Sequence, residues 1–169
     1  MAETECVYKQ VADKSVLAAI REAANELGIE KHKEKQQEAI LSFVNGSDTF
    51  VSLPTGYGKS IIYAVLPLVF DKLRQVTGSI VICVSPLVSL MMDQKAKFTP
   101  RGLVAEFVGE AQTDHQAASR VVNGKVQLVL ISPESLLNNC MYRNMLLNQH
   151  YKDKLVALVI DEAHCIKLW

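Results

Sequence analysis

The chain lacks an excess of charge of either sign. Lys and Arg together number 18 and Asp and Glu number 18, so the formal net charge is zero over 169 residues. This excludes the strongly basic field that draws many proteins to nucleic acid. Any contact with nucleic acid would have to come from a local patch or from backbone N–H groups.

The chain is also poor in cysteine and in long apolar runs. Its four cysteines show no C-x-x-C spacing, and Cys83 lies inside an apolar run, so we expect reduced thiols in an intracellular compartment. The longest apolar run, 61–70, contains Pro67 and is too short to span a bilayer. The polar, acidic N-terminus has no features of a signal peptide. We therefore expect a soluble protein that does not engage a membrane.

The chain does contain a segment typical of phosphate binding, Leu53-Pro54-Thr55-Gly56-Tyr57-Gly58-Lys59-Ser60. Its two glycines allow a tight turn that brings N–H groups close to a phosphate. The lysine can reach the β- and γ-phosphates of a nucleotide, and the serine can ligate Mg²⁺ at the positive end of the following helix. Leu53 departs from the strict G-x-x-x-x-G-K-[ST] pattern, and the alternative is a glycine-rich turn with an ordinary surface lysine. The candidate nucleotide-binding residues here are Thr55, Gly56, Tyr57, Gly58, Lys59 and Ser60.

A second candidate motif is the acidic pair Asp161-Glu162, which follows the apolar run 155–160. A parallel strand delivers its last residues to the carboxyl edge of the sheet, the same edge where a buried strand at 50–53 would release the phosphate segment. Asp161 can hold the Mg²⁺ shell, and Glu162 can orient and deprotonate an attacking water. With Lys59, this pair forms the candidate catalytic set. The alternative is a strand followed by a solvated acidic turn.

The apolar pattern predicts an α/β fold. Continuous apolar strands that alternate with helices indicate a parallel sheet covered by helices on both faces. We expect a helical segment over 1–45 and the α/β domain over 46–169. Strands are predicted at 50–53, 80–85, 104–108, 127–131 and 155–160, and helices at 15–27, 36–44, 59–74, 87–97, 113–123 and 134–148.

Three strings, in this order along the chain, resemble superfamily 2 helicases, and within them the RecQ family of ATP-dependent DNA helicases. The segment 53–60 looks like helicase motif I, and Ser85-Pro86-Leu87-Val88-Ser89-Leu90-Met91 looks like motif Ia. Asp161-Glu162-Ala163-His164-Cys165 resembles the DEAH form of motif II, in which Cys follows His in RecQ proteins. The resemblance implies a first RecA-like lobe that uses ATP and Mg²⁺ and stops, at Trp169, just after motif II.

The resemblance also implies contacts with DNA. Ser85-Pro86-Leu87 ends a strand and starts a helix, and its N–H groups together with the Ser85 and Ser89 hydroxyls can bind an anion, in this family a DNA phosphate. The alternative is a capped helix that contacts nothing, and Ser132-Pro133-Glu134 allows the same two interpretations. Gln112 follows another strand end, in a loop that faces nucleic acid in relatives and that could equally be a solvated turn. His164 relays the nucleotide state toward the DNA in the family, or is simply a satisfied hydrogen-bonding group.

Upstream of motif I, RecQ relatives carry a segment like F-G-Y-x-x-F-R-P-x-Q that holds adenine. Here Gln36 is retained, and its amide can pair with an adenine edge. Ile29 and His32 replace the two aromatics, and Lys33 replaces the arginine and loses its planar fork. We therefore expect reduced selectivity for adenine. The alternative is that Gln36 merely opens a solvated helix.

The function implied by the resemblance is the N-terminal ATP-binding lobe of a RecQ-like helicase acting in DNA repair. Joined to a second RecA-like lobe, it would couple ATP hydrolysis to 3′–5′ DNA unwinding, in the nucleus if the source is eukaryotic. Since an arginine finger from a second lobe is worth about 10³–10⁵ in rate, we expect weak nucleotide binding and negligible unwinding from these 169 residues alone. The alternative is a non-catalytic module that binds nucleotide, nucleic acid or a protein partner without turnover. An unrelated P-loop ATPase or kinase is disfavoured by the motif Ia and motif II strings.

Overall fold

The computed structural model describes residues 2–30 and 32–168, with side chains over 14–30 and 32–165. The chain divides into two compact units, 1–76 and 77–169, which we call unit 1 and unit 2. This division reflects backbone contacts, and the predicted boundary after residue 45 stays a prediction. Trp169, where the predicted lobe stops, lies outside the described residues.

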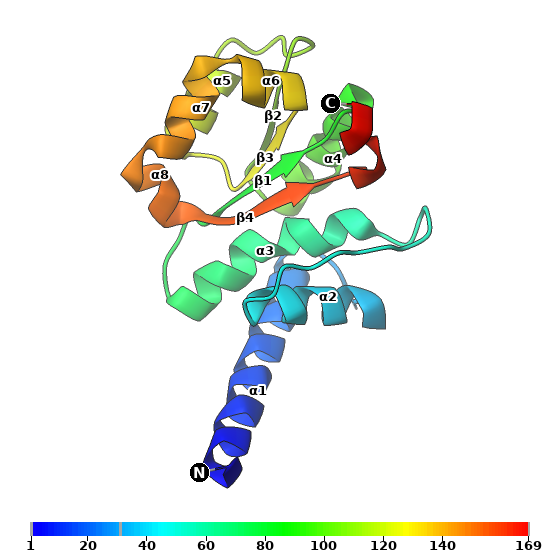
Figure 1. Ribbon diagram of the computed structural model, residues 1–169, viewed down its shortest axis with the longest axis vertical. Helices are drawn as coiled ribbons and strands as arrows, with labels where there is room; N and C mark the ends of the chain where they lie inside the picture. The colour runs from blue at the N-terminus through cyan, green and yellow to red at the C-terminus, as the bar shows by residue number, and fades with distance from the viewer. Residues whose placement is uncertain (1, 31, 169) are drawn as a thin grey trace. The chain divides into compact units, whose positions relative to one another are not determined.

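Unit 1 is built from three helices, α1 (Ala2–Glu26), α2 (Glu34–Val44) and α3 (Lys59–Arg74), each in contact with the other two (Figure 1). The predicted stop of the first helix is confirmed, since Gly28 takes a left-handed φ of 63° just beyond its end. The helix itself begins much earlier than the predicted residue 15. The predicted bounds of α3 are confirmed at both ends. Apolar side chains from all three helices form the core of the unit, among them Ile20, Ala23, Leu27, Ile40, Ala64 and Val65.

The strand predicted at 50–53 is wrong. Residues 47–54 have no regular secondary structure, and the Phe50 side chain is 86% exposed. An extended segment becomes a strand only where a neighbouring strand takes up its N–H and C=O groups. The described part of unit 1 contains no other strand, so this apolar run has no such partner within its own unit.

Unit 2 contains a four-stranded sheet in the order β2-β3-β1-β4, and every pair in it is parallel. This confirms the predicted α/β class, and four of the five predicted strands form within a residue of their expected bounds. Each strand residue in β1, β2 and β3 is buried, as expected for a sheet covered on both faces. The strands are β1 (Ile80–Val84), β2 (Ala105–Val108), β3 (Leu128–Ile131) and β4 (Leu155–Ile160).

The connections of unit 2 put helices on both faces of this sheet. The chain runs from β1 outward to β2 through α4 (Val88–Phe98) and then returns, so right-handed crossovers place α4 on one face and the later helices on the other, as Figure 1 shows. The second face carries an apolar cluster, with Ile82 and Val129 from the sheet and Tyr142 and Met145 from a helix. The remaining elements are η1 (Thr99–Arg101), α5 (Ala117–Val122), α6 (Pro133–Asn138), α7 (Cys140–Leu147), α8 (Gln149–Lys154) and η2 (Ala163–Leu168).

The long helix predicted at 134–148 is divided into α6 and α7. Asn139 lies between them with an extended ψ of 114°, and its Oδ1 accepts a hydrogen bond of 2.9 Å from the Met141 N–H. Asparagine competes with the helical backbone in this way, because its short side chain can satisfy the first N–H groups of a new helix. Apolar periodicity alone does not reveal such an interruption.

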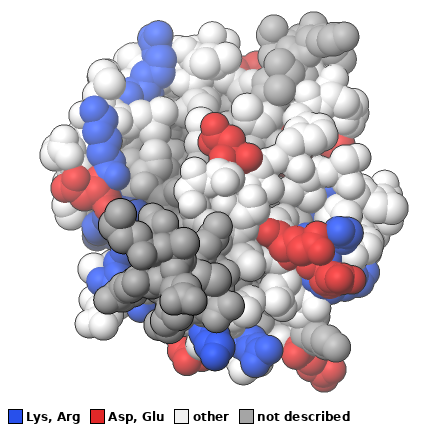
Figure 2. Space-filling view, turned by 60° about the horizontal axis from the view of Figure 1, so that its bottom comes forward, with Lys and Arg blue, Asp and Glu red and all other residues white. Residues whose placement is uncertain are grey.

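The distribution of surface charge is consistent with the equal numbers of acidic and basic residues. On the face shown in Figure 2, acidic and basic side chains are interspersed among uncharged ones. Across the described residues, no helix combines the length and the apolar character that crossing a membrane requires.

Candidate functional site

The phosphate segment in unit 1 forms a tight loop that leads directly into α3. Gly56 and Gly58 have φ values of 79° and 92°, a left-handed conformation that glycine adopts without steric cost. The loop is closed by a hydrogen bond of 3.2 Å from the Tyr57 N–H to the Pro54 carbonyl, and α3 begins at Lys59. Ser60 is buried in the first helical turn. The backbone therefore has the turn and the helix start that the predicted phosphate site requires.

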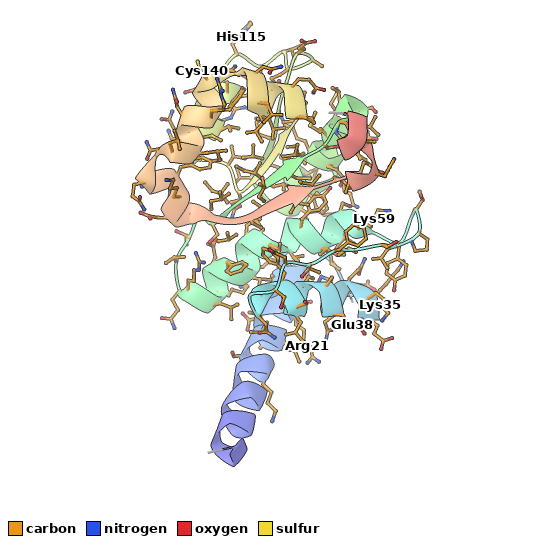
Figure 3. The ribbon with its side chains drawn as sticks, viewed as in Figure 1. Arg21, Lys35, Glu38, Lys59, His115 and Cys140 are labelled. Atoms are coloured by element: carbon orange, nitrogen blue, oxygen red, sulfur yellow. The ribbon has the colours of Figure 1, made fainter. Side chains whose placement is uncertain are left out.

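The Lys59 side chain folds back over this loop. Its Nζ donates to the Leu53 carbonyl at 3.0 Å, and Figure 3 shows Lys59 at the start of α3. The amine is thus held beside the loop, by a residue six positions earlier in the chain, and does not extend into solvent. An ammonium in this position can exchange a carbonyl oxygen for a phosphate oxygen with a small movement of the side chain.

Gln36 supports the loop from α2. It is 1% exposed, and its Nε2 donates to the Tyr57 and Gly58 carbonyls at 3.0 and 3.1 Å. Its Oε1 accepts from the Lys33 N–H at 2.9 Å, which also caps the start of α2. A Cβ at Gly58 would lie 2.7 Å from the Gln36 Nε2, so this close approach requires glycine. The alternative in which Gln36 opens a solvated helix is therefore wrong.

Among the other residues of the predicted adenine segment, Lys33 contacts the same loop. The Lys33 Nζ lies 4.4 Å from the centre of the Tyr57 ring, a cation–π contact. Ile29 and His32 are both buried. Burial lowers the pKa of the His32 imidazole, and its Nε2 has no hydrogen-bond partner among the described residues. A cavity of about 690 Å³ opens here, lined by His32, Lys33, Glu34, Gln37, Glu38 and Leu41.

In unit 2, the acidic pair lies directly beyond the end of β4. The Asp161 N–H donates to the Val84 carbonyl at 2.9 Å, so the pair is fixed at the carboxyl edge of the sheet, as predicted. Glu162 has a φ of 53°, which is uncommon for a residue with a side chain. A backbone conformation of this kind persists only where the surrounding structure holds it, and such residues are often found at functional sites. His164 is 77% exposed, and its Nδ1 lies 3.3 Å from the Glu162 carboxylate.

The predicted anion-binding segment begins at the end of β1, on the same edge of unit 2. Ser85 is 2% exposed, and its Oγ has no hydrogen-bond partner among the described residues. The helix that follows, α4, has no side-chain cap and no acidic residue in its first turn. Leu87 and Ser89 are exposed there and Pro86 is partly buried. A buried hydroxyl beside an uncapped helix start is an arrangement that suits an anion.

The two other predicted contact residues of unit 2 are occupied within the protein. The Ser132 Oγ accepts from the Ser135 N–H at 3.1 Å and caps α6. The Gln112 side-chain amide donates to the Phe107 carbonyl at 2.7 Å and to Glu106 at 3.2 Å, and its oxygen accepts from the Asp114 N–H at 2.9 Å. Gln112 therefore holds its own loop together.

The structure thus gathers the predicted residues into two groups. The group in unit 1 contains the phosphate loop with Gln36 and Lys33, and the group in unit 2 contains the strand ends at residues 85–89 and 161–164. The predicted convergence of Lys59 with Asp161 and Glu162 joins residues of different units and stays a prediction. Sequence reasoning missed Glu106, although a lone carboxylate inside the apolar run 104–108 was a usable signal.

Comparison with known proteins agrees with the motifs. The DEAD/DEAH box helicase model matches residues 33–169. The chain is 30% identical to the ATP-dependent DNA helicase RecQ of Haemophilus influenzae over 100% of this chain and 25% of the relative. It is 33% identical to the RecQ-like DNA helicase blm-1 of Caenorhabditis elegans, over 86% of this chain and 14% of the relative.

A yeast relative extends this pattern. The ATP-dependent helicase SGS1 of Saccharomyces cerevisiae is 34% identical over 81% of this chain and 10% of its own length. The chain therefore spans a quarter or less of these three curated relatives. The resemblance to RecQ helicases is confirmed, and since the family model covers most of the sequence, the chain belongs to the DEAD/DEAH box helicase family.

Proposed function

We propose that the chain is the N-terminal ATP-binding lobe of a RecQ-like DNA helicase, with a helical segment over 1–45 and a RecA-like lobe over 46–169. Joined to a second RecA-like lobe, it would couple ATP hydrolysis to 3′–5′ unwinding of single-stranded or forked DNA in repair. For a eukaryotic source we propose a nuclear location. The observation that carries the proposal is the loop at 53–60, whose left-handed glycines and internal lysine bond suit a triphosphate.

The residues of unit 1 fit the nucleotide as follows. The bonds from Gln36 and Lys59 end on the carbonyls of Tyr57, Gly58 and Leu53, so they hold the loop without consuming its N–H groups. We assign the N–H groups of residues 55–60, other than the Tyr57 N–H that closes the loop, to the phosphates, and the Lys59 amine to the β- and γ-phosphates. Lys33, Gln36 and the cavity beside them are assigned to the adenine side. Since Gln36 also supports the loop, we expect modest selectivity for the base.

The acidic pair completes the proposed chemistry. We assign Ser60 and Asp161 to Mg²⁺, partly through water, and the metal would neutralise charge on the β- and γ-phosphates. Glu162 would orient the attacking water and accept its proton, and its constrained backbone suits a group that must point one way. His164, in contact with Glu162, is assigned to coupling between the nucleotide and the DNA.

DNA is assigned to the carboxyl edge of unit 2. The Ser85 hydroxyl, buried without a described partner, and the start of α4 would receive a backbone phosphate, with Pro86, Leu87 and Ser89 beside it. Gln112 would contribute to this surface through the loop that it holds. The family match favours this enzyme over a module without turnover. For the 169-residue chain alone we expect weak nucleotide binding and negligible unwinding.

The substitution K59A tests the nucleotide site. Removing the ammonium should weaken binding of a fluorescent ATP analogue with Mg²⁺ by about tenfold or more, the worth of one charge-assisted hydrogen bond. In a longer chain that includes the second lobe, it should also abolish ATPase activity. The matched control is K125A, which removes an exposed lysine of unit 2. Equal affinity in K59A and the unaltered chain, or equal losses in both variants, would contradict the assignment.

A further inference from the structure

Glu106 is a carboxylate in the middle of a buried strand. It lies in β2, one of the two outer strands of the sheet, and is 4% exposed. Burying a charged group is costly unless it is paired and hydrogen-bonded. An apolar residue of similar volume would fill this position at no such cost, since replacing buried ion pairs by apolar groups is often neutral or stabilising. The charge therefore calls for a reason beyond packing.

Two basic side chains compensate the charge, one on each carboxylate oxygen. The Lys95 Nζ of α4 bonds Oε1, and the Arg120 Nη2 of α5 bonds Oε2. These helices cover opposite faces of the sheet. Both can nevertheless reach Glu106, because β2 is an edge strand and its side chains are accessible from around the edge. Burial by itself would raise the pKa of the Glu106 carboxyl, but the hydrogen bonds and charges of Lys95 and Arg120 outweigh it and lower the pKa. Glu106 is thus a fixed anion.

The same carboxylate is bonded to the loop that follows β2, residues 109–116. One connection runs through Gln112, whose Nε2 donates to Glu106 and whose oxygen accepts from the Asp114 N–H. The other runs through Arg120, whose Nη2 also donates to the Asp114 carboxylate at 2.6 Å. Asp114 in turn accepts from the Gln116 N–H at 2.9 Å. Both connections end in the backbone of the loop, so Glu106 fixes its conformation from inside the sheet.

The held loop belongs to the edge of unit 2 that carries the other strand ends. A Cβ at Gly109 would lie 3.8 Å from the Ser135 Oγ, so the loop begins beside the start of α6. Thr113 and His115 are exposed on it, and Figure 3 shows His115 projecting away from the sheet. Because all four strands are parallel, this loop and Ser85 lie at the same edge.

We propose that Glu106 is a positioning residue for nucleic-acid binding, which holds the 109–116 loop so that its exposed backbone and the Thr113 hydroxyl meet a phosphate of single-stranded DNA. The proposal rests on the proposed function, which places DNA at this edge. It also assigns Gln112 to the support of the loop, as the connection between Glu106 and the DNA-facing residues. Glu106 touches no DNA itself.

The test compares the unaltered chain with E106Q for binding to a fluorescein-labelled single-stranded oligonucleotide. E106Q removes one negative charge and, by simple electrostatics, should leave DNA affinity equal or higher. The proposal predicts the opposite sign, a loss of about tenfold, because the loop is released. The matched control E22Q makes the same charge change at an exposed site on α1 and should leave affinity unchanged. Hydrogen exchange should quicken at the Asp114 and Gln116 amides in E106Q.

A second variant keeps the test valid should E106Q not fold. Q112A changes no charge, and it should also weaken DNA binding, by a smaller factor because the connection through Arg120 remains. Where both variants fold, the double variant should be no weaker than E106Q alone, since the connection through Gln112 is one of the two that E106Q already weakens. Unchanged or tighter DNA binding in E106Q or Q112A, or additive losses in the double variant, would overturn the positioning role while leaving the proposed function intact. If the unaltered chain binds no DNA, the proposed DNA function fails and the positioning role fails with it.

Discussion

In unit 1 the phosphate loop is already held by hydrogen bonds from the protein, whereas in unit 2 the strand end at Ser85 contains a buried hydroxyl with no described partner. The bonds from Gln36 and Lys59 satisfy loop carbonyls and preserve the loop geometry without a ligand. Since no described residue bonds the Ser85 hydroxyl, a bound ligand would give it a partner. Changes in unit 1 should therefore damage stability and binding together, and the change at Ser85 should separate the two.

The largest effect is expected from G58A. The substitution places a Cβ 2.7 Å from the Gln36 Nε2 at a residue whose φ is 92°. Either the loop or the Gln36 side chain must move, and a displacement of about 1 Å can lower activity by about 10²-fold. We expect a loss of about that size in Mg²⁺–ATP affinity, and about 1–3 kcal/mol in the free energy of unfolding.

The control for this prediction is G46A. Gly46 has nearly the same φ, 90°, but a Cβ there meets nothing within 4 Å. G46A should therefore show the cost of the left-handed backbone alone, about 1 kcal/mol, with unchanged nucleotide affinity. If G46A and G58A weaken nucleotide binding equally, the contact with Gln36 is not what shapes the loop.

S85A is expected to have a smaller effect, which differs in sign between stability and DNA binding. Removing a buried hydroxyl that has no partner should leave the free energy of unfolding unchanged or raise it by about 1 kcal/mol. Binding of single-stranded DNA should weaken by about tenfold, because a hydrogen bond to a phosphate is lost. The control is S79A, at the amino end of the same strand, where Ser79 is buried but does have a partner.

S79A should therefore lower stability and spare DNA binding. Denaturant unfolding and fluorescence anisotropy give the two quantities for each variant. A loss of stability in S85A without a loss of DNA affinity would show that its hydroxyl serves the fold.

The smallest effects concern pH, and they differ between the units. Burial lowers the pKa of His32 from its ordinary 6.5, so the unfolded chain takes up a proton that the folded imidazole resists. Unit 1 should lose stability as pH falls below about 6.5. The pKa of Glu106 is lowered from 4.5, so its contribution to unit 2 is present above that value and is lost as pH falls below it.

These two dependences can be measured separately by hydrogen exchange in each unit between about pH 8 and about pH 4. H32N should flatten the change below pH 6.5 in unit 1 and leave unit 2 unaltered. The same slope in H32N and the unaltered chain would show that another group titrates.

The helices and strands with an uninterrupted apolar pattern were predictable from the sequence. The helix 59–74 and the strands of unit 2 follow from apolar runs, and β1, β2 and β3 are buried throughout. The strand at 50–53 could not be judged in this way, because strand formation depends on a partner strand that an apolar run does not itself specify. Asn139 shows a second limit, since its capping bond to Met141 divides a segment with helical periodicity.

The candidate site was predictable in its residue types and less so in its contacts. The spacing of Gly56, Gly58 and Lys59 indicated the loop, but not that Gln36 would contact it from α2. The resemblance implied that Gln112 contacts nucleic acid, with a solvated turn as the alternative. The bonds of Gln112 to Glu106 and Phe107 depend on a carboxylate inside β2, which periodicity treats as an exception.

The most direct test of the account is a titration of the chain with Mg²⁺–ATP, followed through its backbone amide resonances. The proposed function has the phosphate loop and the acidic pair acting on one nucleotide. It predicts shifts at residues 55–60 together with shifts at Asp161 and Glu162, all lost in K59A. Shifts that spare residues 55–60, or that leave Asp161 and Glu162 unaffected when the loop is saturated, would contradict it.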